Sequence, residues 1–144
     1  MNFKFLEESK PLGTAGSLSL LDKDIKEQII ITNCDVIVDL DYADLYEFHK
    51  KGDYDITLVA SANEFTLPYG VCVLNEEGSL DLIREKPKFD FLINTGLYVI
   101  KPEVIRMIPK DKFFDFTDLV EKVKGEGKKI GVYPVDDELF TDIG

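Results

Sequence analysis

The residues of this sequence that could do chemistry are isolated carboxylates, one of which follows an apolar run. Asp35 comes shortly after the strand-like run at residues 28–32, which contains three isoleucines in a row. Ligands of open α/β sheets bind beyond the carboxyl ends of strands, and a carboxylate there suits Mg²⁺, which prefers oxygen ligands. The alternative is that Asp35 caps a turn, and its position favours neither interpretation. Asp142 is a second isolated aspartate near the end of the chain, and spacing alone does not show whether the two carboxylates meet.

Two further segments carry groups suited to a sugar phosphate. Glu85 and Lys86 stand side by side before a proline, so an acceptor for hydroxyl groups lies next to a cation for a phosphate. Asn94 offers both a donor and an acceptor, and Gly96 weakens a strand unless something needs close approach to the backbone. The structural alternatives are a solvated charged turn for the first segment and a β-bulge for the second.

A glycine-rich turn at residues 10–16 precedes an expected helix and contains Gly13 and Thr14. Glycines allow a ligand to approach the backbone, and a helix N-terminus favours anions or polar base edges. A tight turn with no ligand is the more common explanation. The one histidine, His49, is followed by two lysines at the end of an expected helix. We predict that it faces solvent or the helix dipole and is not a ligand.

The elements that must position these residues alternate between strand-like and helix-like patterns, which is typical of the α/β class. The patterns predict strands at residues 3–7, 28–32, 55–61, 91–100 and 127–135, a hairpin at 69–74 and 80–85, and helices at 13–21, 41–51, 102–109 and 115–123. Their sum is a mixed, mostly parallel sheet flanked by helices. The run at 28–32 is predicted to be a central strand covered on both faces.

Composition excludes several classes of protein. The 144 residues suit one domain, and the formal net charge of −11 argues against general binding of nucleic acid, which needs a positive footprint. No apolar run approaches the ~20 residues that span a bilayer, and the first ten residues do not resemble a signal peptide. Cys34 and Cys72 lie in apolar stretches and form no metal-binding spacing, so we expect small buried hydrophobes and a cytoplasmic location.

The order of six short motifs resembles the sugar-1-phosphate nucleotidyltransferase family. They are Pro11-Leu12-Gly13-Thr14-Ala15-Gly16, Thr32-Asn33-Cys34-Asp35, Pro68-Tyr69-Gly70-Val71, Glu85-Lys86-Pro87, Asn94-Thr95-Gly96-Leu97-Tyr98 and Asp142-Ile143-Gly144. The resemblance implies the Rossmann-like fold of nucleotide-diphospho-sugar transferases, incomplete at its N-terminus, with residues 1–144 as the C-terminal portion of that domain. The Asn-Cys-Asp form, together with Phe48-His49-Lys50 and the Pro-Tyr-Gly segment, is most similar to guanylyltransferases of bacterial nonulosonic (legionaminic) acid pathways.

The resemblance implies a reaction between a nucleoside triphosphate and a sugar-1-phosphate, with Mg²⁺ as cofactor and pyrophosphate as leaving group. It also implies a role for each matching residue: Asp35 and Asp142 for the metal, Asp35 and Lys86 for catalysis at the phosphate, Gly13 and Thr14 for the base, and Gly70, Glu85 and Asn94 for the sugar.

Two departures from the family pattern stand out. This sequence contains no Gly-Gly-x-Gly-Thr-Arg loop, and therefore no Pro-Lys following such a loop, which are the segments that contact the triphosphate in the family. Removing one such donor typically costs about 10²–10³ in rate, so we expect this chain alone to be impaired. The second departure lies at the final Asp-Ile-Gly, which an aromatic often precedes shortly in the family. Here Thr141 stands directly before Asp142, and the aromatic Phe140 comes one residue earlier.

Two other classes of function stay open at this point. The chain could be a non-catalytic remnant that binds nucleotide sugars. It could also be a metal-dependent glycosyltransferase, because Asp39-Leu40-Asp41 imitates a D-x-D metal motif, although capping of the next helix explains Asp41 as well. An exposed sheet edge would favour a homo-oligomer.

Overall fold

The computed structural model describes residues 3–22 and 24–144, and its centre is a four-stranded sheet. The strands lie in the order β1 (Ile29–Thr32), β6 (Lys88–Ile100), β3 (Ile56–Thr66) and β7 (Ile130–Asp136). β6 is antiparallel to β1 and β3, whereas β7 is parallel to β3. β1, β3 and β7 therefore run in one direction and β6 in the other, so the sheet is mixed as predicted, with two antiparallel pairings and one parallel pairing.

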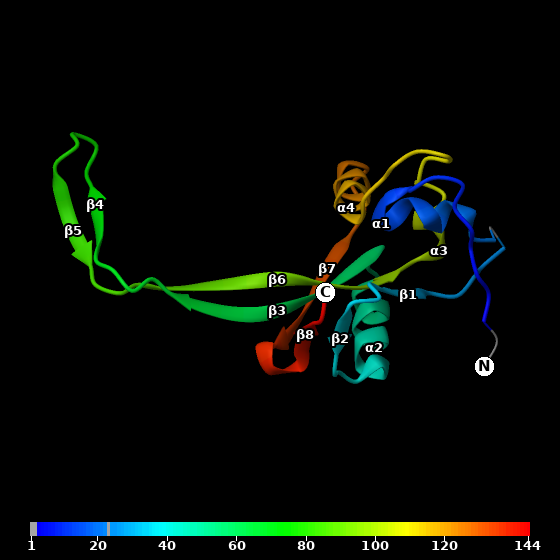
Figure 1. Cartoon of the computed structure of the whole chain (residues 1–144), viewed down its shortest axis with the longest axis horizontal. Helices are drawn as coiled ribbons and strands as arrows, with labels where there is room; N and C mark the ends of the chain where they lie inside the picture. Colours follow the sequence, from blue (N-terminus) through cyan, green and yellow to red (C-terminus); the bar gives the residue numbers. More distant parts are fainter. Residues whose placement is uncertain (1–2, 23) are drawn as a thin grey trace.

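Helices and a second small sheet cover the two faces of the central sheet (Figure 1). One face packs against α1 (Gly13–Gly16), α3 (Pro102–Ile105) and α4 (Phe116–Gly125). The other face packs against α2 (Tyr42–Gly52) and β2 (Val36–Val38), which pairs with β8 (Phe140–Asp142). Short 3₁₀-helices at Ser17–Leu20 (η1) and Asp137–Leu139 (η2) complete the chain. The chain thus forms three layers with a core on each side of the sheet.

The two longer helices begin where the sequence places their capping residues. Asp41 Oδ1 accepts hydrogen bonds from the backbone N–H groups of Ala43 (2.8 Å) and Asp44 (3.4 Å) at the start of α2. Asp115 forms a reciprocal capping box with Asp118 at the start of α4. Among the described residues, no helix is long and apolar enough to cross a membrane.

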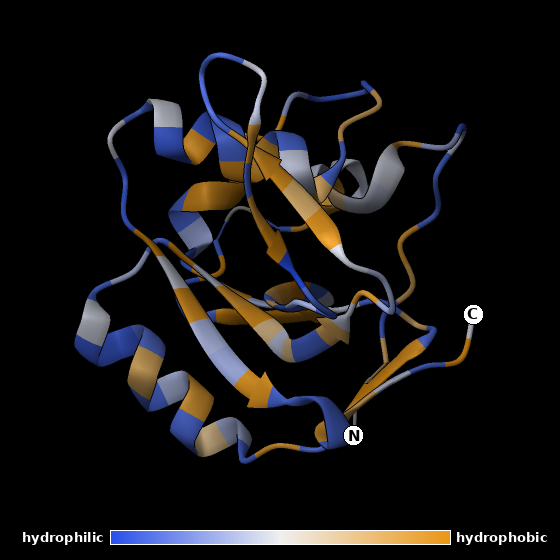
Figure 2. Cartoon of the chain, turned by 90° about the vertical axis from the view of Figure 1, so that its left-hand side faces the viewer, coloured by the Kyte–Doolittle hydropathy of each residue, from blue (hydrophilic) through white to orange (hydrophobic). Residues whose placement is uncertain are grey.

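A long two-stranded arm projects from the layered body. β3 and β6 continue past the other strands of the sheet and lead to the antiparallel hairpin of β4 (Val71–Leu74) and β5 (Leu80–Arg84) at the far end of the molecule (Figure 1). This hairpin confirms the predicted one. Large apolar side chains are exposed along the arm and hairpin: Phe65, Tyr69, Leu74, Leu80, Leu82, Ile83, Phe89, Phe91, Leu92 and Ile93. Figure 2 views the molecule from the hairpin end of this arm, and parts of the strands are coloured as hydrophobic.

Two strand predictions are wrong. Residues 3–7 form no strand, and Phe3 and Phe5 are exposed. β1 is not a central strand: within the described residues it pairs only with β6 and lies at an edge of the sheet. Ile29 and Ile31 pack on the core beside the helices, whereas Ile30 on the other face is 43% exposed. A continuous apolar run is therefore covered here on one face only.

The prediction that both cysteines are buried is also wrong. Cys34 is exposed because it lies in the turn between β1 and β2. Cys72 is exposed because it lies on the hairpin, where the chain has no other layer to cover it. Apolar neighbours in sequence did not indicate burial at either position.

Candidate functional site

A bulge in β6 shapes the centre of the candidate site. Leu58 of β3 pairs with Tyr98, but Ala60, two residues on, pairs with Asn94, so β6 contains extra residues at this point. Gly96 adopts a φ of 80°, which favours glycine. The Thr95 hydroxyl is buried and donates to the Val59 carbonyl at 2.9 Å. The β-bulge expected as the structural alternative is thus present, and bulges of this kind redirect side chains.

The bulge holds the Asn94 carboxamide in a fixed orientation. Its Nδ2 donates to the Tyr98 hydroxyl at 2.8 Å, and its Oδ1 accepts from the Gly96 N–H at 3.2 Å. Tyr98 stacks on Phe116 with ring centroids 3.6 Å apart, and burial raises the pKa of its phenol. Because an amide nitrogen carries two hydrogens, Asn94 keeps one donor for another partner.

Asp35 and Asp142 come together although they are far apart in the sequence. Val36 pairs with Asp142 across the β2–β8 ladder, and the Ile143 N–H donates to the Asp35 carbonyl at 2.8 Å. A Cβ atom on Gly144 would lie 2.9 Å from Asp35 Oδ2 and 3.4 Å from Asp142 Oδ1. Both carboxylates therefore border the same small volume.

These two aspartates share a cavity of about 170 Å³ with Asn94. Asn33 and Gly96 also line it, and they are joined by a hydrogen bond from Asn33 N to Gly96 O of 3.0 Å. Its polar lining includes carboxylate and amide oxygens, the kind of ligand that Mg²⁺ prefers. In the part of the chain that the structure describes, no group of three or more His, Cys, Asp or Glu side chains is placed to hold a metal. An ion held by the two aspartates would need other ligands from water or phosphate, which is usual for Mg²⁺.

The other predicted sugar-binding residues lie elsewhere, at the end of the arm. A Cβ atom on Gly70 would lie 3.0 Å from Glu85 Oε2, so these two residues are neighbours at the base of the hairpin. Lys86 follows with a φ of 44°. From the start of β6 to Asn94 the extended strand covers about 20 Å. The structure therefore does not bring Gly70, Glu85 and Lys86 to the two aspartates, and their roles stay predictions.

Gly13 and Thr14 connect α1 to α4. The Thr14 N–H donates to Asp115 Oδ1 at 3.0 Å, and the Thr14 hydroxyl accepts the Phe116 N–H at 2.8 Å. Gly13 has a φ of 81°, and a Cβ there would lie 2.8 Å from both Asp115 Oδ1 and the Phe114 carbonyl oxygen. These contacts give the glycine-rich turn a structural purpose. Its predicted place near the base is not tested by them.

The predicted solvent-facing position of His49 is wrong, because its side chain is fully buried. Its Nδ1 lies 2.8 Å from Thr57 Oγ1, and its Nε2 lies 3.3 Å from Gln28 Oε1. Burial, and secondly the charge of Lys101, lower the pKa of His49 below its usual 6.5. Two neutral hydrogen-bond partners make burial of the uncharged ring favourable. The spacing of His49 four residues after buried Leu45 placed it on the inner face of α2.

Among the cavity residues without a predicted role, Asn33 and Tyr98 belong to the quoted motifs. Asn33 lies next to Gly96, and Tyr98 holds Asn94. The resemblance of Asp39 and Asp41 to a D-x-D motif is explained by the cap that Asp41 provides for α2. Asp39 and Asp41 are not among the residues that line this cavity.

The architecture and the position of the cavity define a class of protein. A mixed α/β sheet whose polar cluster lies beyond the carboxyl end of a strand is the arrangement of α/β proteins that bind ligands at the sheet edge. The sequence profile of the family described as "Nucleotidyl transferase" matches residues 1–144. The chain belongs to this family, which confirms the predicted sugar-1-phosphate nucleotidyltransferase group.

Individual relatives agree with this assignment. Mannose-1-phosphate guanyltransferase 2 of Candida glabrata is 40% identical over 153 residues, which cover 100% of this chain and 41% of that protein. The structure of HddC from Yersinia pseudotuberculosis superposes with a TM-score of 0.65 at 25% identity, covering 94% of this chain and 59% of HddC. Its complex with GMP-PN gives a TM-score of 0.64 at 24% identity, with the same coverage. The chain thus spans about two fifths of the length of this curated relative.

Proposed function

We propose that the cavity between β2, β6 and β8 is the metal and sugar-phosphate part of a nucleotidyltransferase site. The observation that carries this proposal is the meeting of Asp35, Asn94 and Asp142 at one cavity. The whole protein would transfer a nucleotidyl group from a nucleoside triphosphate to a sugar-1-phosphate.

In this reaction a phosphate oxygen of the sugar-1-phosphate attacks the α-phosphorus of the triphosphate. The bond from that phosphorus to the bridging oxygen of the β-phosphate breaks, and pyrophosphate leaves with the electron pair. Bound Mg²⁺ would neutralise charge on the reacting phosphates. Asp35 and Asp142 would hold the ion, and the fixed Asn94 carboxamide would orient the sugar by its remaining N–H. Such a site acts mainly by positioning and by electrostatic stabilisation.

We propose guanine as the base, and this is supported by the guanyltransferase of Candida glabrata and by the GMP-PN complex of HddC. A narrower place among guanylyltransferases of bacterial nonulosonic (legionaminic) acid pathways rests on the Asn33-Cys34-Asp35 motif and the Pro68-Tyr69-Gly70 segment. A cytoplasmic location follows from the same proposal, since nucleoside triphosphates are substrates.

Glu85, Lys86 and Gly70 are proposed to contact the sugar and its phosphate from the hairpin. For this the hairpin and the aspartates must approach the same ligand, across the length of the β3–β6 arm. Gly13 and Thr14 are proposed to lie near the base. We further propose that this chain alone has little turnover, because it contains no Gly-Gly-x-Gly-Thr-Arg segment.

Calorimetry with GDP-mannose, in MgCl₂ and in EDTA, tests the proposed function on this chain. We expect binding in MgCl₂ that is lost in EDTA and in the Asp35→Asn variant. Glu47→Gln is a matched control, because Glu47 is an exposed carboxylate on α2 outside the cavity. Binding that is equal in MgCl₂ and EDTA, or equally reduced in both variants, would contradict the proposed metal site. Parallel titrations with dTDP-glucose and UDP-glucose test the base.

Self-association is proposed on the apolar side chains of the arm. Phe89 and Phe91 stack along one face of β6 with centroids 6.4 Å apart, and both are about half exposed. Exposed apolar patches of this kind mark interaction surfaces. Light scattering on the purified chain tests it, and a monomer at all concentrations would contradict it.

A further inference from the structure

The β3–β6 arm has one apolar face and one charged face. Directly paired residues, and residues two apart on one strand, point to the same side of a sheet. The pairing of β3 with β6 therefore defines an apolar arm face, which consists of Phe65, Phe89, Phe91 and Ile93. Each of these side chains is between 41% and 53% exposed, and none belongs to either core of the described residues. The opposite face carries the ion pair between Lys88 and Glu64, and also Asp90.

The apolar arm face lies on the side of the sheet that carries β2 and β8. On β3, Ser61 and Asn63 point to the same side as Phe65. Both donate hydrogen bonds to Asp137 Oδ1 of η2, at 3.3 Å and 2.8 Å. η2 leads directly into β8, which ends at Asp142. A molecule that covers the apolar arm face therefore lies beside the aspartate cavity.

The hairpin of the same copy cannot reach that cavity while the arm stays paired. β3 and β6 pair without a register shift from the Ala60–Asn94 pair to the end of the ladder at Lys88. This ladder keeps the base of the hairpin about 20 Å from Asn94, and folding the arm back would break it. Glu85 and Lys86 therefore need another route to the aspartates.

Two arms stacked face to face in opposite directions provide that route. Phe91 lies at the middle of the apolar arm face on β6, and Lys86 and Gly96 are each five residues from it. A two-fold axis beside Phe91 therefore brings Lys86 of one copy opposite Gly96 of the other. Gly96 lines the aspartate cavity. Stacked sheets lie about 10 Å apart, so the hairpin of one copy enters the layer that contains β2 and β8 of the other.

We propose that two copies of this chain pair through their apolar arm faces, and that the hairpin of each copy completes the aspartate cavity of the other. The proposal rests on the proposed function, which assigns the sugar and its phosphate to Glu85 and Lys86. The charges are complementary, because the base of the hairpin carries two cations, Arg84 and Lys86, against one carboxylate, whereas the cavity carries two carboxylates.

The area of the apolar arm face also requires contacts beyond it. A half-exposed phenyl ring buries roughly 100 Å², so the three rings of each copy bury roughly 600 Å² in the pair. Stable interfaces bury about 1,200–2,000 Å² in total. Contacts between the hairpin of one copy and the body of the other supply the remaining area.

Chemical cross-linking tests this arrangement without a ligand. Cys34 is exposed in the turn between two residues of the cavity, Asn33 and Asp35. In a Cys72→Ser background, a short bismaleimide should join Lys86→Cys to Cys34 of the other copy, and Cys34→Ser should abolish this link. Glu77→Cys is the matched control, because Glu77 lies in the turn at the far end of the hairpin. Absence of the link, or an equal yield with Glu77→Cys, would overturn the proposal.

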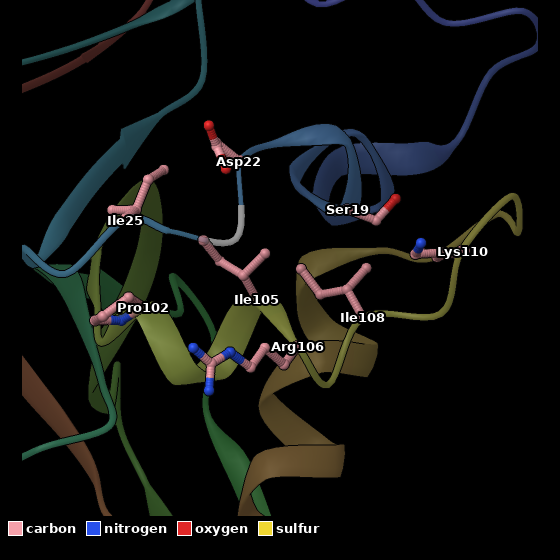
Figure 3. Close-up of a pocket in the computed structure, with 8 residues that line it drawn as sticks. All are labelled: Ser19, Asp22, Ile25, Pro102, Ile105, Arg106, Ile108 and Lys110. Atoms are coloured by element: carbon pink, nitrogen blue, oxygen red, sulfur yellow. The ribbon is translucent and has the colours of Figure 1, made fainter.

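Self-association is measured by light scattering and by NMR on dilution of the chain. Phe91→Glu should weaken it at least about a hundredfold, since each pair loses two buried rings. Phe113→Glu, at a phenyl ring exposed outside the arm, should leave it unchanged. The pocket between α3 and the segment after α1 (Figure 3) is an internal reference, because Ile105 and Ile108 line it and belong to the core on the other side of the sheet. Their methyl signals should stay constant while those of Ile93 shift, and equal shifts would contradict the proposed face.

Mixing two defective variants tests the exchange of hairpins in binding. Asp35→Asn and Lys86→Gln should each lose binding of GDP-mannose in MgCl₂. In an equimolar mixture half of the pairs are mixed, and each mixed pair has one site with both groups intact, so about a quarter of the sites should bind. A mixture that binds nothing, although the wild-type chain binds, would overturn the proposal. Cross-linking as expected in a wild-type chain that does not bind GDP-mannose would support the paired arrangement and contradict the proposed function alone.

Discussion

Substitution of Gly96 by alanine should distort the candidate site for two separate reasons. Gly96 has a φ of 80°, and a residue with a side chain costs about 1–2 kcal/mol in the left-handed region. The new Cβ atom would also lie 2.8 Å from Asn33 Nδ2 and 2.9 Å from Asn33 Cγ. These contacts are too close to be tolerated, so Asn33 or the bulge must move.

Gly78 provides a reference that isolates the backbone cost. Its φ is 83°, and an added Cβ would meet nothing within 4 Å. We therefore expect Gly78→Ala to destabilise the chain by about 1 kcal/mol. Gly96→Ala adds the contact with Asn33, whose side chain is exposed and able to yield. That adds about 1 kcal/mol, the lower end of overpacking costs, for a total of about 2–3 kcal/mol.

Urea denaturation of the two variants and the wild-type chain measures this difference. A double variant, Gly96→Ala with Asn33→Ala, should recover part of the loss, because the crowded amide is removed. The side-chain amide signals of Asn94 should shift in Gly96→Ala but not in Gly78→Ala, since Asn94 Oδ1 accepts the Gly96 N–H. If Gly96→Ala is no more destabilising than Gly78→Ala, the close approach between β6 and Asn33 is refuted.

Three further predictions concern single side chains, two near the site and one in the core. Tyr98→Phe removes the acceptor of the Asn94 amide but keeps the ring on Phe116, so unfolding free energy should fall by about 1 kcal/mol; unchanged urea midpoints and Asn94 signals would refute this. Thr14→Val removes the acceptor of the Phe116 N–H, so the free energy of unfolding should fall by about 1 kcal/mol, as it does when a helix cap is lost. Thermal unfolding measures this change, and an unaltered melting temperature would count against the α1–α4 connection. Burial lowers the pKa of His49 below 6.5, so unfolding takes up a proton as the pH falls through 6.5 toward the lower folded pKa, and stability decreases over that window. NMR titration of the ring and urea curves at several pH values check this, and a His49 that titrates at 6.5 or above would contradict it.

Local signals in the sequence predicted much of the fold. Asp41 and Asp115 begin helices as expected, because a cap depends only on the next three or four residues. The hairpin around Asn75 and Gly78 formed for the same reason: its turn is closed by hydrogen bonds between neighbouring residues. The sequence also indicated the bulge near Asn94, since a glycine such as Gly96 in a strand interior often marks a bulge.

Features that depend on distant partners could not be predicted. The burial of His49 depends on Thr57 and Gln28, and the exposure of Cys72 depends on how far the arm projects from the body. β1 was expected at the centre of the sheet, but its apolar run shows only that it packs, not on how many sides. A pairing between β2 and β8 brings Asp35 and Asp142 together, and spacing in the sequence contains no information on it. The order of the family motifs predicted that the two aspartates act together, without showing how.

The most direct test of the central claim is a titration of the chain with Mn²⁺, which replaces Mg²⁺ and broadens nearby NMR signals. If Asp35 and Asp142 hold the metal, the amide signals of Asp35, Asn94, Gly96 and Asp142 should broaden first, and excess Mg²⁺ should restore them. Asp142→Asn should abolish this effect, while Glu47→Gln should leave it unchanged. Broadening that is spread over the acidic surface, or that persists in Asp142→Asn, would contradict a metal site at this cavity.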